Sequence, residues 1–180
     1  DYNEKYYFSP GYSDGVSNFS PINTSIGKLG VLVCWDQWFP EAARIMALQG
    51  ANILIYPTAI GWSSKDDHAE QQRQLSAWQT VQRAHAVANN VFLISCNRTG
   101  REQEEYPYNP DKIKSIDFWG NSFIAGPQGE VLSSLQQETN AIISAELTLD
   151  RIEQIRRAWP FFRDRRVDEY QLLLKKFNIT

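Results

Sequence analysis

Residues 27–44, GKLGVLVCWDQWFPEAAR, decide the fold. The stretch 27–34 contains β-branched residues and leucines, a pattern typical of a strand that is covered on both faces. Pro40 is tolerated in the first turn of a helix, and Glu41 is favourable at a helix N-terminus. Gly50 is well placed to end that helix. The sequence therefore predicts a buried strand followed directly by a helix, with a cysteine at the junction.

The elements that follow extend this unit into a layered domain. Residues 52–56, NILIY, predict a second buried strand, and a right-handed crossover makes two such strands parallel. Asp66 or Asp67 can cap a long helix that ends near Asn89, and residues 91–96, VFLISC, predict a third buried strand. Elsewhere we expect loops at 1–25 and 99–117, strands at 118–125 and 141–147, a turn at 127–130, and a helix from Thr148 with Leu149, Ile152, Ile155 and Trp159 facing inward. This order predicts an α/β sandwich.

The composition is that of an ordinary single globular domain of 180 residues. A net charge of -3 with no basic block argues against nucleic acid as a partner. No apolar run approaches the roughly 20 residues that span a membrane, so we expect no membrane partner. Two cysteines form no disulfide framework, and with two histidines far apart in the sequence a zinc site would need an unusual ligand set. We expect no metal and no cofactor, and a reducing, cytoplasmic location.

The chain begins at Asp1, inside a polar and aromatic stretch that has the character of a loop. It carries no initiator methionine and no signal peptide pattern. We therefore expect residues 1–180 to be a piece of a longer protein. Mass spectrometry of the native protein tests this expectation, because a polypeptide of only this size would contradict it.

Three predicted strands end in polar or reactive residues, namely Cys34, Tyr56-Pro57-Thr58 and Cys96-Asn97-Arg98. In open α/β sheets, ligands bind beyond the carboxyl ends of the strands, so these ends indicate one binding rim. Cys34 precedes a predicted helix, where the helix dipole and free N–H groups favour a thiolate. We interpret Cys34 as a candidate nucleophile and Cys96 as a packed core cysteine.

A thiolate nucleophile needs a base, and the sequence offers only a few candidates for that role. His85 falls on the inward face of the long helix and is interpreted as a core histidine, whereas His68 is interpreted as a solvated residue. Lys28 lies on the same strand as Cys34 but about 20 Å away from it. Glu4, next to Lys5, is a plausible acid–base group near the site. The residues thus supply a nucleophile and one possible carboxylate.

The sequence resembles the carbon-nitrogen hydrolase, or nitrilase, superfamily over nearly its whole length. The segments that carry the resemblance are 3–11 (NEKYYFSPG), 27–62, 82–100 (QRAHAVANNVFLISCNRTG), 118–132 (FWGNSFIAGPQGEVL) and 162–166 (FRDRR). Within the superfamily the chain is most similar to N-carbamoylputrescine amidases. The resemblance implies a four-layer αββα sandwich, here without its N-terminal portion. It also implies a Glu-Lys-Cys triad that is often joined by a second glutamate.

Carried over by the resemblance, the nucleophile is Cys34 and the second glutamate is Glu4. The triad lysine and triad glutamate have no counterpart in the chain and would precede Asp1. The N–H of Trp35 would hold the oxyanion, and Asp36 and Trp38 would contribute to substrate binding. Two further substrate-binding candidates follow the second strand, and these are Ala59 and Ile60.

The implied reaction is hydrolysis of a non-peptide C–N bond, with N-carbamoylputrescine converted to putrescine, carbon dioxide and ammonia in polyamine biosynthesis. Related hydrolases of carbamoyl amino acids often place arginines shortly after the nucleophile, where this chain has Gln37 and Trp38. An amine-bearing substrate therefore fits better than an anionic one, with Trp faces attracting its charge. Asp36, Glu102, Glu104 and Glu105 are possible ammonium partners, although a solvated acidic loop is the simpler interpretation for the last three.

Three alternatives stay open. The chain could be an ω-amidase, a ureidopropionase-type amidohydrolase, or a non-catalytic fragment that serves in assembly. The resemblance implies a homo-oligomer built from dimers, and the apolar and basic segment 159–166 suits a subunit contact. Trp62 and Trp119 lie near strand ends and are interpreted as packing residues more than as pocket lining.

Overall fold

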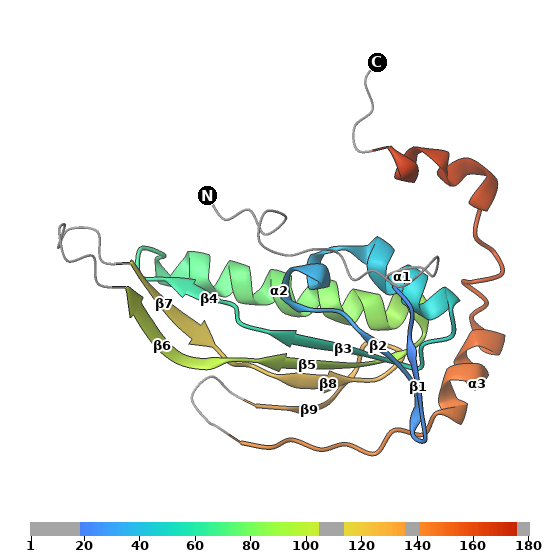
Figure 1. The fold of residues 1–180 in the computed structure, drawn as a ribbon, viewed down its shortest axis with the longest axis horizontal. Coiled ribbons are helices and arrows are strands. Elements are labelled where there is room, and N and C mark those ends of the chain that lie inside the picture. The colour runs from blue at the N-terminus through green and yellow to red at the C-terminus, as the bar shows by residue number, and fades with distance from the viewer. Residues whose placement is uncertain (1–18, 105–113, 136–140, 176–180) are drawn as a thin grey trace.

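A computed structural model describes residues 19–104, 114–135 and 141–175. The strands are β1 (Ile22–Thr24), β2 (Gly27–Val31), β3 (Ile53–Thr58), β4 (Gly61–Ser63), β5 (Phe92–Asn97), β6 (Thr99–Glu104), β7 (Lys114–Trp119), β8 (Phe123–Ala125) and β9 (Val131–Ser134). The helices are α1 (Pro40–Leu48), α2 (His68–Asn89) and α3 (Asp150–Ala158), and 3-10 turns cover Cys34–Trp38 and Val167–Leu174. Figure 1 shows their arrangement.

The main sheet has six strands in the order β1-β2-β3-β5-β8-β9. Its central strands β2, β3 and β5 are parallel, whereas β1, β8 and β9 pair antiparallel with their neighbours. Helices α1 and α2 lie along one face of this sheet (Figure 1). The predicted strand–helix–strand unit and the third parallel strand are thus confirmed. The expectation of a continuous loop at 1–25 is wrong at β1, while residues 1–18 lie outside the described part.

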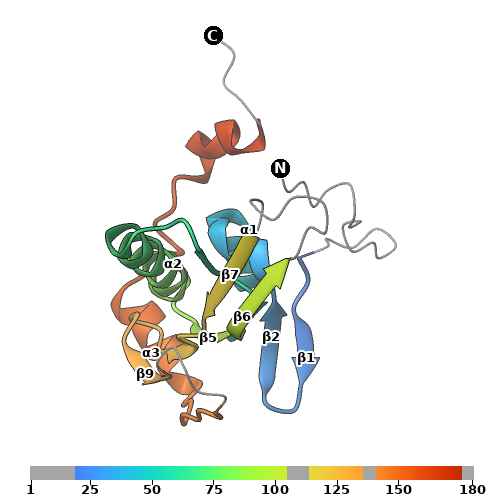
Figure 2. The same cartoon turned by 90° about the vertical axis from the view of Figure 1, so that its left-hand side faces the viewer.

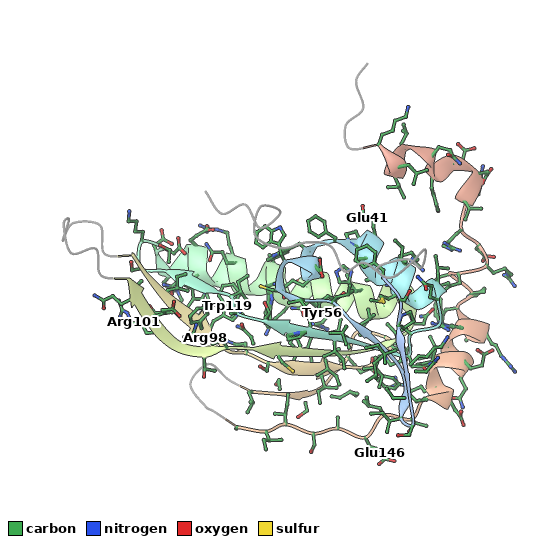
Figure 3. The ribbon with its side chains drawn as sticks, viewed as in Figure 1. Glu41, Tyr56, Arg98, Arg101, Trp119 and Glu146 are labelled. Carbon is green, nitrogen blue, oxygen red and sulfur yellow. The ribbon has the colours of Figure 1, made fainter. Side chains whose placement is uncertain are left out.

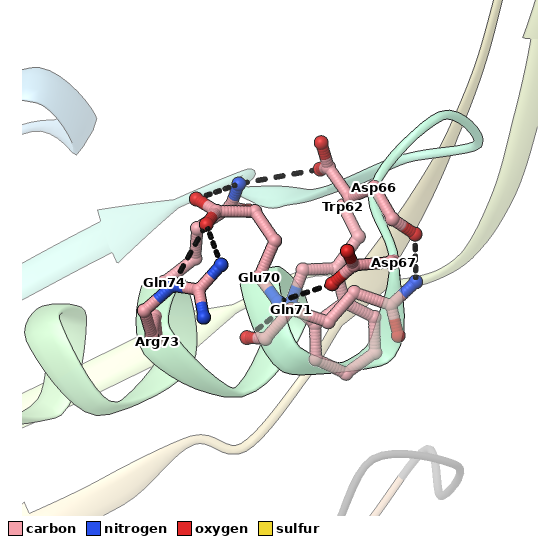
Figure 4. A network of polar contacts seen from close by, with 7 residues as sticks. All are labelled: Trp62, Asp66, Asp67, Glu70, Gln71, Arg73 and Gln74. Carbon is pink, nitrogen blue, oxygen red and sulfur yellow. Dashed lines mark hydrogen bonds and ion pairs between the residues drawn. The ribbon is translucent and has the colours of Figure 1, made fainter.

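Both helices on this face begin and end at the predicted signals. Pro40 occupies the first turn of α1, and Gly50, with a φ of +94°, follows its end. Of the two candidate caps for α2, Asp67 is the one used, since its carboxylate accepts the N–H of Glu70 at 2.8 Å. Figure 4 shows the polar network around this first turn, in which the indole N–H of Trp62 donates to the carbonyl of Gln71 at 3.0 Å. The network fixes β4 to the start of α2.

Alternation along β3 and β5 divides the core into two parts. Leu54, Tyr56 and Leu93 face the helices and are fully buried with Trp78 of α2. The side chains of Ile53 and Phe92 face the opposite side, where they pack against Ile152 of α3. On that side, Ile55 and Ile94 are only half-buried. The described residues therefore supply one helical layer and one sheet layer of the expected αββα sandwich.

A second, three-stranded sheet in the order β4-β7-β6 was not expected. The region 99–117 was predicted to be an exposed loop, but β6 and β7 pair antiparallel, with Thr99 opposite Trp119 and Glu104 opposite Lys114. Figure 2 shows this hairpin beside the ends of the main sheet. The prediction was wrong because the outer part of β6 is exposed and lacks the apolar alternation by which half-buried strands are recognised.

Two further strand predictions were also wrong. The expected strand 118–125 is split between β7 and β8, because Gly120 and Asn121 adopt positive φ values of 55° and 53°. The segment 141–147 has no assigned strand, although its side chains alternate between exposed and half-buried. The turn at 127–130 is confirmed.

Helix α3 and Phe162 pack the C-terminal segment against the body. Ile152 and Ile155 of α3 are buried as expected, but Trp159 lies beyond the helix and is 57% exposed. The ring of Phe162 instead packs against the core, with Arg44 and Arg156 placed 4.7 and 4.9 Å from its centroid. These two arginines also donate to the last carbonyl groups of α2, those of Ala88 and Asn89. They therefore stabilise the C-terminal end of α2 as well as the ring.

In the described ranges, no helix combines the length and the apolar character that crossing a bilayer requires.

Gly61 allows β4 to approach β7, because a Cβ at this position would lie 2.4 Å from the carbonyl oxygen of Asp117. The variant Gly61→Ala should force the two strands apart and lower the free energy of unfolding by about 1–3 kcal/mol. Urea unfolding of the intact protein measures this loss. Gly100→Ala is the comparison, since nothing lies within 4 Å of its added Cβ and only its φ of +94° opposes alanine. A loss at Gly61 no larger than that at Gly100 would contradict the crowding argument.

Candidate active site

Cys34 lies just beyond the carboxyl end of β2, at the start of the 3-10 turn Cys34–Trp38. Its φ is +49°, a region that non-glycine residues seldom adopt. Asp36 closes the turn twice, because its N–H donates to the carbonyl of Val33 at 3.1 Å and its carboxylate accepts the N–H of Val33 at 3.0 Å. The turn thus holds a strained backbone at the cysteine.

The expectation that Cys34 stands directly before the crossover helix needs correction. The 3-10 turn follows it, and α1 begins only at Pro40. A helix dipole acts within its first turn, so α1 does not supply the field that the sequence suggested for Cys34.

The end of β3 contacts Cys34 and the end of β5 lies beside it in the sheet, as the strand-end argument predicted. Thr58 and Asn97 are paired in the sheet register. The hydroxyl of Thr58 donates to Sγ of Cys34 at 3.3 Å. Asn97 holds the segment that follows β3, since its amide accepts from the N–H of Ile60 at 2.9 Å and donates to the carbonyl of Ile60 at 3.0 Å. Half-buried Ile60 and its exposed neighbour Ala59 are thereby fixed on the rim.

The two tryptophans of the turn have different surroundings. Trp35 is 55% exposed, whereas Trp38 is half-buried, and their rings meet edge to face with centroids 6.3 Å apart. Trp38 lines a shallow apolar hollow together with Ala77 and Val81 of α2. Trp35 therefore presents an open aromatic surface next to Cys34, while Trp38 is turned toward the helix.

Gln37 is fully buried in the turn, and this role was not predicted. Its side-chain oxygen accepts the indole N–H of Trp78 at 2.8 Å, and its amide nitrogen donates to the Thr58 hydroxyl at 3.3 Å. Nε2 of His85 lies 2.9 Å from its main-chain carbonyl oxygen. Sequence reasoning took position 37 as one that lacks an arginine clamp, but no local signal marked its partners on α2.

The predicted core histidine is confirmed, since His85 is 3% exposed. Burial lowers its pKa, and the hydrogen bond to the Gln37 carbonyl offsets part of that effect. Burial also raises the pKa of Tyr56, with a smaller contribution from the charge of Asp36. Figure 3 places Tyr56 between the sheet and α2. Both groups are therefore neutral near pH 7.

The acidic candidates, and Lys5 beside Glu4, have no described contact with Cys34. Glu4, Lys5 and Glu105 lie outside the described residues, as does the side chain of Glu104. Glu102 pairs with Arg98 at 2.5 Å, and Arg98 also stacks on Phe118 at the hairpin (Figure 3).

The interpretation of Cys96 as a core residue was wrong. Cys96 is exposed, because it lies on the face of β5 opposite to buried Ser95 and the helices. The packing interpretation of Trp62 and Trp119 is confirmed, since they are 5% and 1% exposed and their rings lie 5.5 Å apart.

The lowered pKa of His85 predicts a dependence of stability on pH. In the unfolded chain an imidazole gains its proton near pH 6.5, whereas folded His85 gains it only at lower pH. The unfolded state therefore binds more protons in this window, so stability falls as the pH decreases below about 6.5. In His85→Gln, an amide still donates toward Gln37 but cannot titrate. Urea unfolding between about pH 7 and pH 5 should show a shallower pH dependence for the variant. An unchanged slope would contradict the assignment.

Known proteins resemble this chain in sequence and in fold. A model of the carbon-nitrogen hydrolase family matches residues 1–157. The chain is 45% identical over 173 residues to the N-carbamoylputrescine amidase of Arabidopsis thaliana, covering 96% of this chain and 54% of that protein. It is 39% identical over 176 residues to the citrullinase of Francisella tularensis, covering 98% of this chain and 57% of that protein. The chain thus spans about half the length of these curated relatives.

A solved structure with the same fold is that of a carbon-nitrogen hydrolase from Helicobacter pylori G27. It is 51% identical, with a TM-score of 0.86 over 97% of this chain and 57% of that chain. The nitrilase-like α/β fold expected from the sequence is therefore confirmed. Because the family model covers residues 1–157 of 180, the chain belongs to the carbon-nitrogen hydrolase family.

Proposed function

We propose that the protein hydrolyses the C–N bond of an N-carbamoyl amine, with N-carbamoylputrescine as the preferred substrate and Cys34 as the nucleophile. The observation that carries the proposal is the placement of Cys34, whose sulfur receives a hydroxyl hydrogen bond in a strained turn at the rim of the sheet. Its likeness to N-carbamoylputrescine amidases, at 45% identity to the Arabidopsis thaliana protein, supports the same reaction. The products are putrescine, carbon dioxide and ammonia.

The proposed reaction has two steps. The Cys34 thiolate attacks the carbamoyl carbon, and the bond from that carbon to the terminal nitrogen breaks as the nitrogen takes a proton and leaves as ammonia. Water then attacks the carbonyl carbon of the covalent intermediate and gives up a proton. The C–S bond breaks, so that the carbamate leaves and the Cys34 thiol is regenerated. The carbamate product decays to carbon dioxide and the free amine. The N–H of Trp35 stabilises the oxyanion in both steps.

The proposal assigns the groups that activate Cys34 to sequence preceding Asp1. The chain covers 54% of the Arabidopsis thaliana relative, and the family resemblance leaves the triad glutamate and lysine without a counterpart in residues 1–180. These residues are then the C-terminal part of one hydrolase domain, and Glu4 is the second glutamate, positioning the substrate or relaying a proton. In this proposal the described residues contain the nucleophile Cys34, its hydrogen-bond donor Thr58, and Gln37, which donates to Thr58.

A cationic substrate is supported by the surroundings of the nucleophile. Trp35 presents a 55% exposed indole beside Cys34, and an ammonium group is attracted to the face of such a ring. Position 37 holds a buried glutamine, so no guanidinium is offered there to a carboxylate. Ala59 and Ile60 form the opposite wall in this proposal, with Asp36 and Trp38 framing the turn.

The proposed assembly is a homo-oligomer built from dimers, located in the cytoplasm. Trp159 and Phe161 are 57% and 41% exposed in the segment 159–166, which supports a contact with a second copy of the chain. Both described cysteines are free, which is compatible with a reducing compartment.

Replacing the nucleophile tests the assignment directly. Cys34→Ser in the intact protein should lower ammonia release by at least about a thousandfold, because a hydroxyl without its own activating base is a poor nucleophile. Circular dichroism and thermal unfolding should be close to those of the parent protein. Cys96→Ser is the matched control and should keep full turnover. Activity within about tenfold of the parent in Cys34→Ser would refute the proposed chemistry.

The substrate assignment requires its own measurement. Ammonia release should be fastest with N-carbamoylputrescine, which carries a free ammonium group and no carboxylate. Citrulline and N-carbamoyl-β-alanine, which both carry a carboxylate, should have lower kcat/KM values. A preference for N-carbamoyl-β-alanine would overturn the cationic interpretation, and a preference for an ω-amide would favour the ω-amidase alternative.

A further inference from the structure

A continuous line of hydrogen bonds connects the buried centre of α2 with the sulfur of Cys34. The indole of Trp78 contacts the Gln37 side chain at 2.8 Å, Gln37 contacts Thr58 at 3.3 Å, and Thr58 contacts Cys34 at 3.3 Å. Trp78 and Gln37 are both 0% exposed, so water does not compete for these groups. We call these four residues the sulfur relay.

The chemistry of the groups fixes the direction of every bond in the sulfur relay. An indole nitrogen can only donate, so the Gln37 atom that it contacts must be the carbonyl oxygen. The other end of that amide carries two hydrogens and can only donate, so the Thr58 oxygen must accept from it. The single hydroxyl hydrogen of Thr58 is then free to point at Cys34. Each donor is thus oriented toward the sulfur.

A second contact from α2 holds Gln37 in place. His85 is neutral because burial lowers its pKa, and its Nε2 faces a main-chain carbonyl oxygen, which can only accept. Nε2 therefore carries the hydrogen and donates to Gln37. Helix α2 contacts the same glutamine through its side chain and its main chain. Such a residue has little freedom to move when charge changes at its neighbour.

We propose that Thr58 and Gln37 are positioning residues that hold the Cys34 sulfur ready for attack through the sulfur relay. The Thr58 hydroxyl stabilises negative charge on the sulfur, and it directs the thiol's own proton away from β3 and toward the base. Polarisation along the line of donors strengthens the last bond. The inference rests on the proposed function for its catalytic meaning, but the reactivity of the sulfur can be measured without any substrate.

A purely structural role is the competing explanation. Thr58 is half-buried at the end of β3, and its contact with Cys34 could do no more than pack two strand ends together. Thr58→Val keeps the shape of the side chain and removes the hydroxyl, whereas Thr58→Ser removes a methyl group and keeps the hydroxyl. The two variants therefore separate hydrogen bonding from packing.

The test is the rate at which iodoacetamide alkylates Cys34 in the intact protein. Cys96 is exposed and would also react, so all variants carry Cys96→Ser, and the modified peptide is quantified by mass spectrometry. Thr58→Val should slow alkylation about tenfold near pH 7 and move the rate–pH profile to higher pH. Thr58→Ser should stay within about twofold of the parent. A Thr58→Val profile equal to that of the parent would overturn the proposal.

The far end of the sulfur relay has a matched control. Trp78→Phe keeps an aromatic ring but removes the donor to Gln37, while Trp119→Phe removes an equally buried indole whose Nε1 has no partner among the described residues. Both changes lose ring volume and stability. Only Trp78→Phe should slow alkylation and shift its pH profile. Equal profiles for the two variants would show that packing alone is involved.

The same protein samples separate this inference from the proposed function. Slower alkylation in Thr58→Val, together with no hydrolysis of any carbamoyl amine by the parent, would sustain the sulfur relay and refute the proposed reaction. Hydrolysis that depends on Cys34 but not on the Thr58 hydroxyl, with unchanged alkylation, would do the reverse.

Discussion

The burial of the Gln37 amide is the constraint on which the geometry around Cys34 depends. A buried amide that lacks hydrogen-bond partners is costly, so its oxygen and nitrogen must each meet a partner. Trp78 of α2 satisfies the oxygen, and Thr58 at the end of β3 satisfies the nitrogen. The amide therefore links the helical layer to the rim of the sheet. Cys34 lies in the same short turn, and its position follows from that link.

Much of the central sheet could be predicted from the sequence, because its signals are local. Short apolar runs mark β2, β3 and β5, and Pro40, Gly50 and Asp67 mark the helix ends. The hairpin of β6 and β7 could not be predicted in this way. The outer part of β6 is exposed and lacks an apolar alternation, so no local signal marks it as a strand. Conversely, 141–147 has a strand-like pattern but no partner strand among the described residues.

The site, too, was predictable only in part from the sequence. The meeting of Cys34 with the end of β3 follows from parallel topology, and helical periodicity predicted that His85 is buried. The role of Gln37 was hidden, because its partner Trp78 lies 41 residues further along the chain. The error at Cys96 has a related cause, since the pattern of β5 indicates burial but not which face another layer covers. Sequence reasoning succeeded where contacts follow from topology and failed where they depend on one side chain.

The positive φ of Cys34 sets stability against function at this position. At +49°, glycine would occupy the same backbone without strain, whereas a β-branched residue would be strongly disfavoured. Thermal selection alone would therefore favour the loss of the side chain that carries the sulfur. Under the proposed function the cysteine is kept here for its sulfur, and a search for more heat-resistant forms of this protein should leave position 34 out of its library.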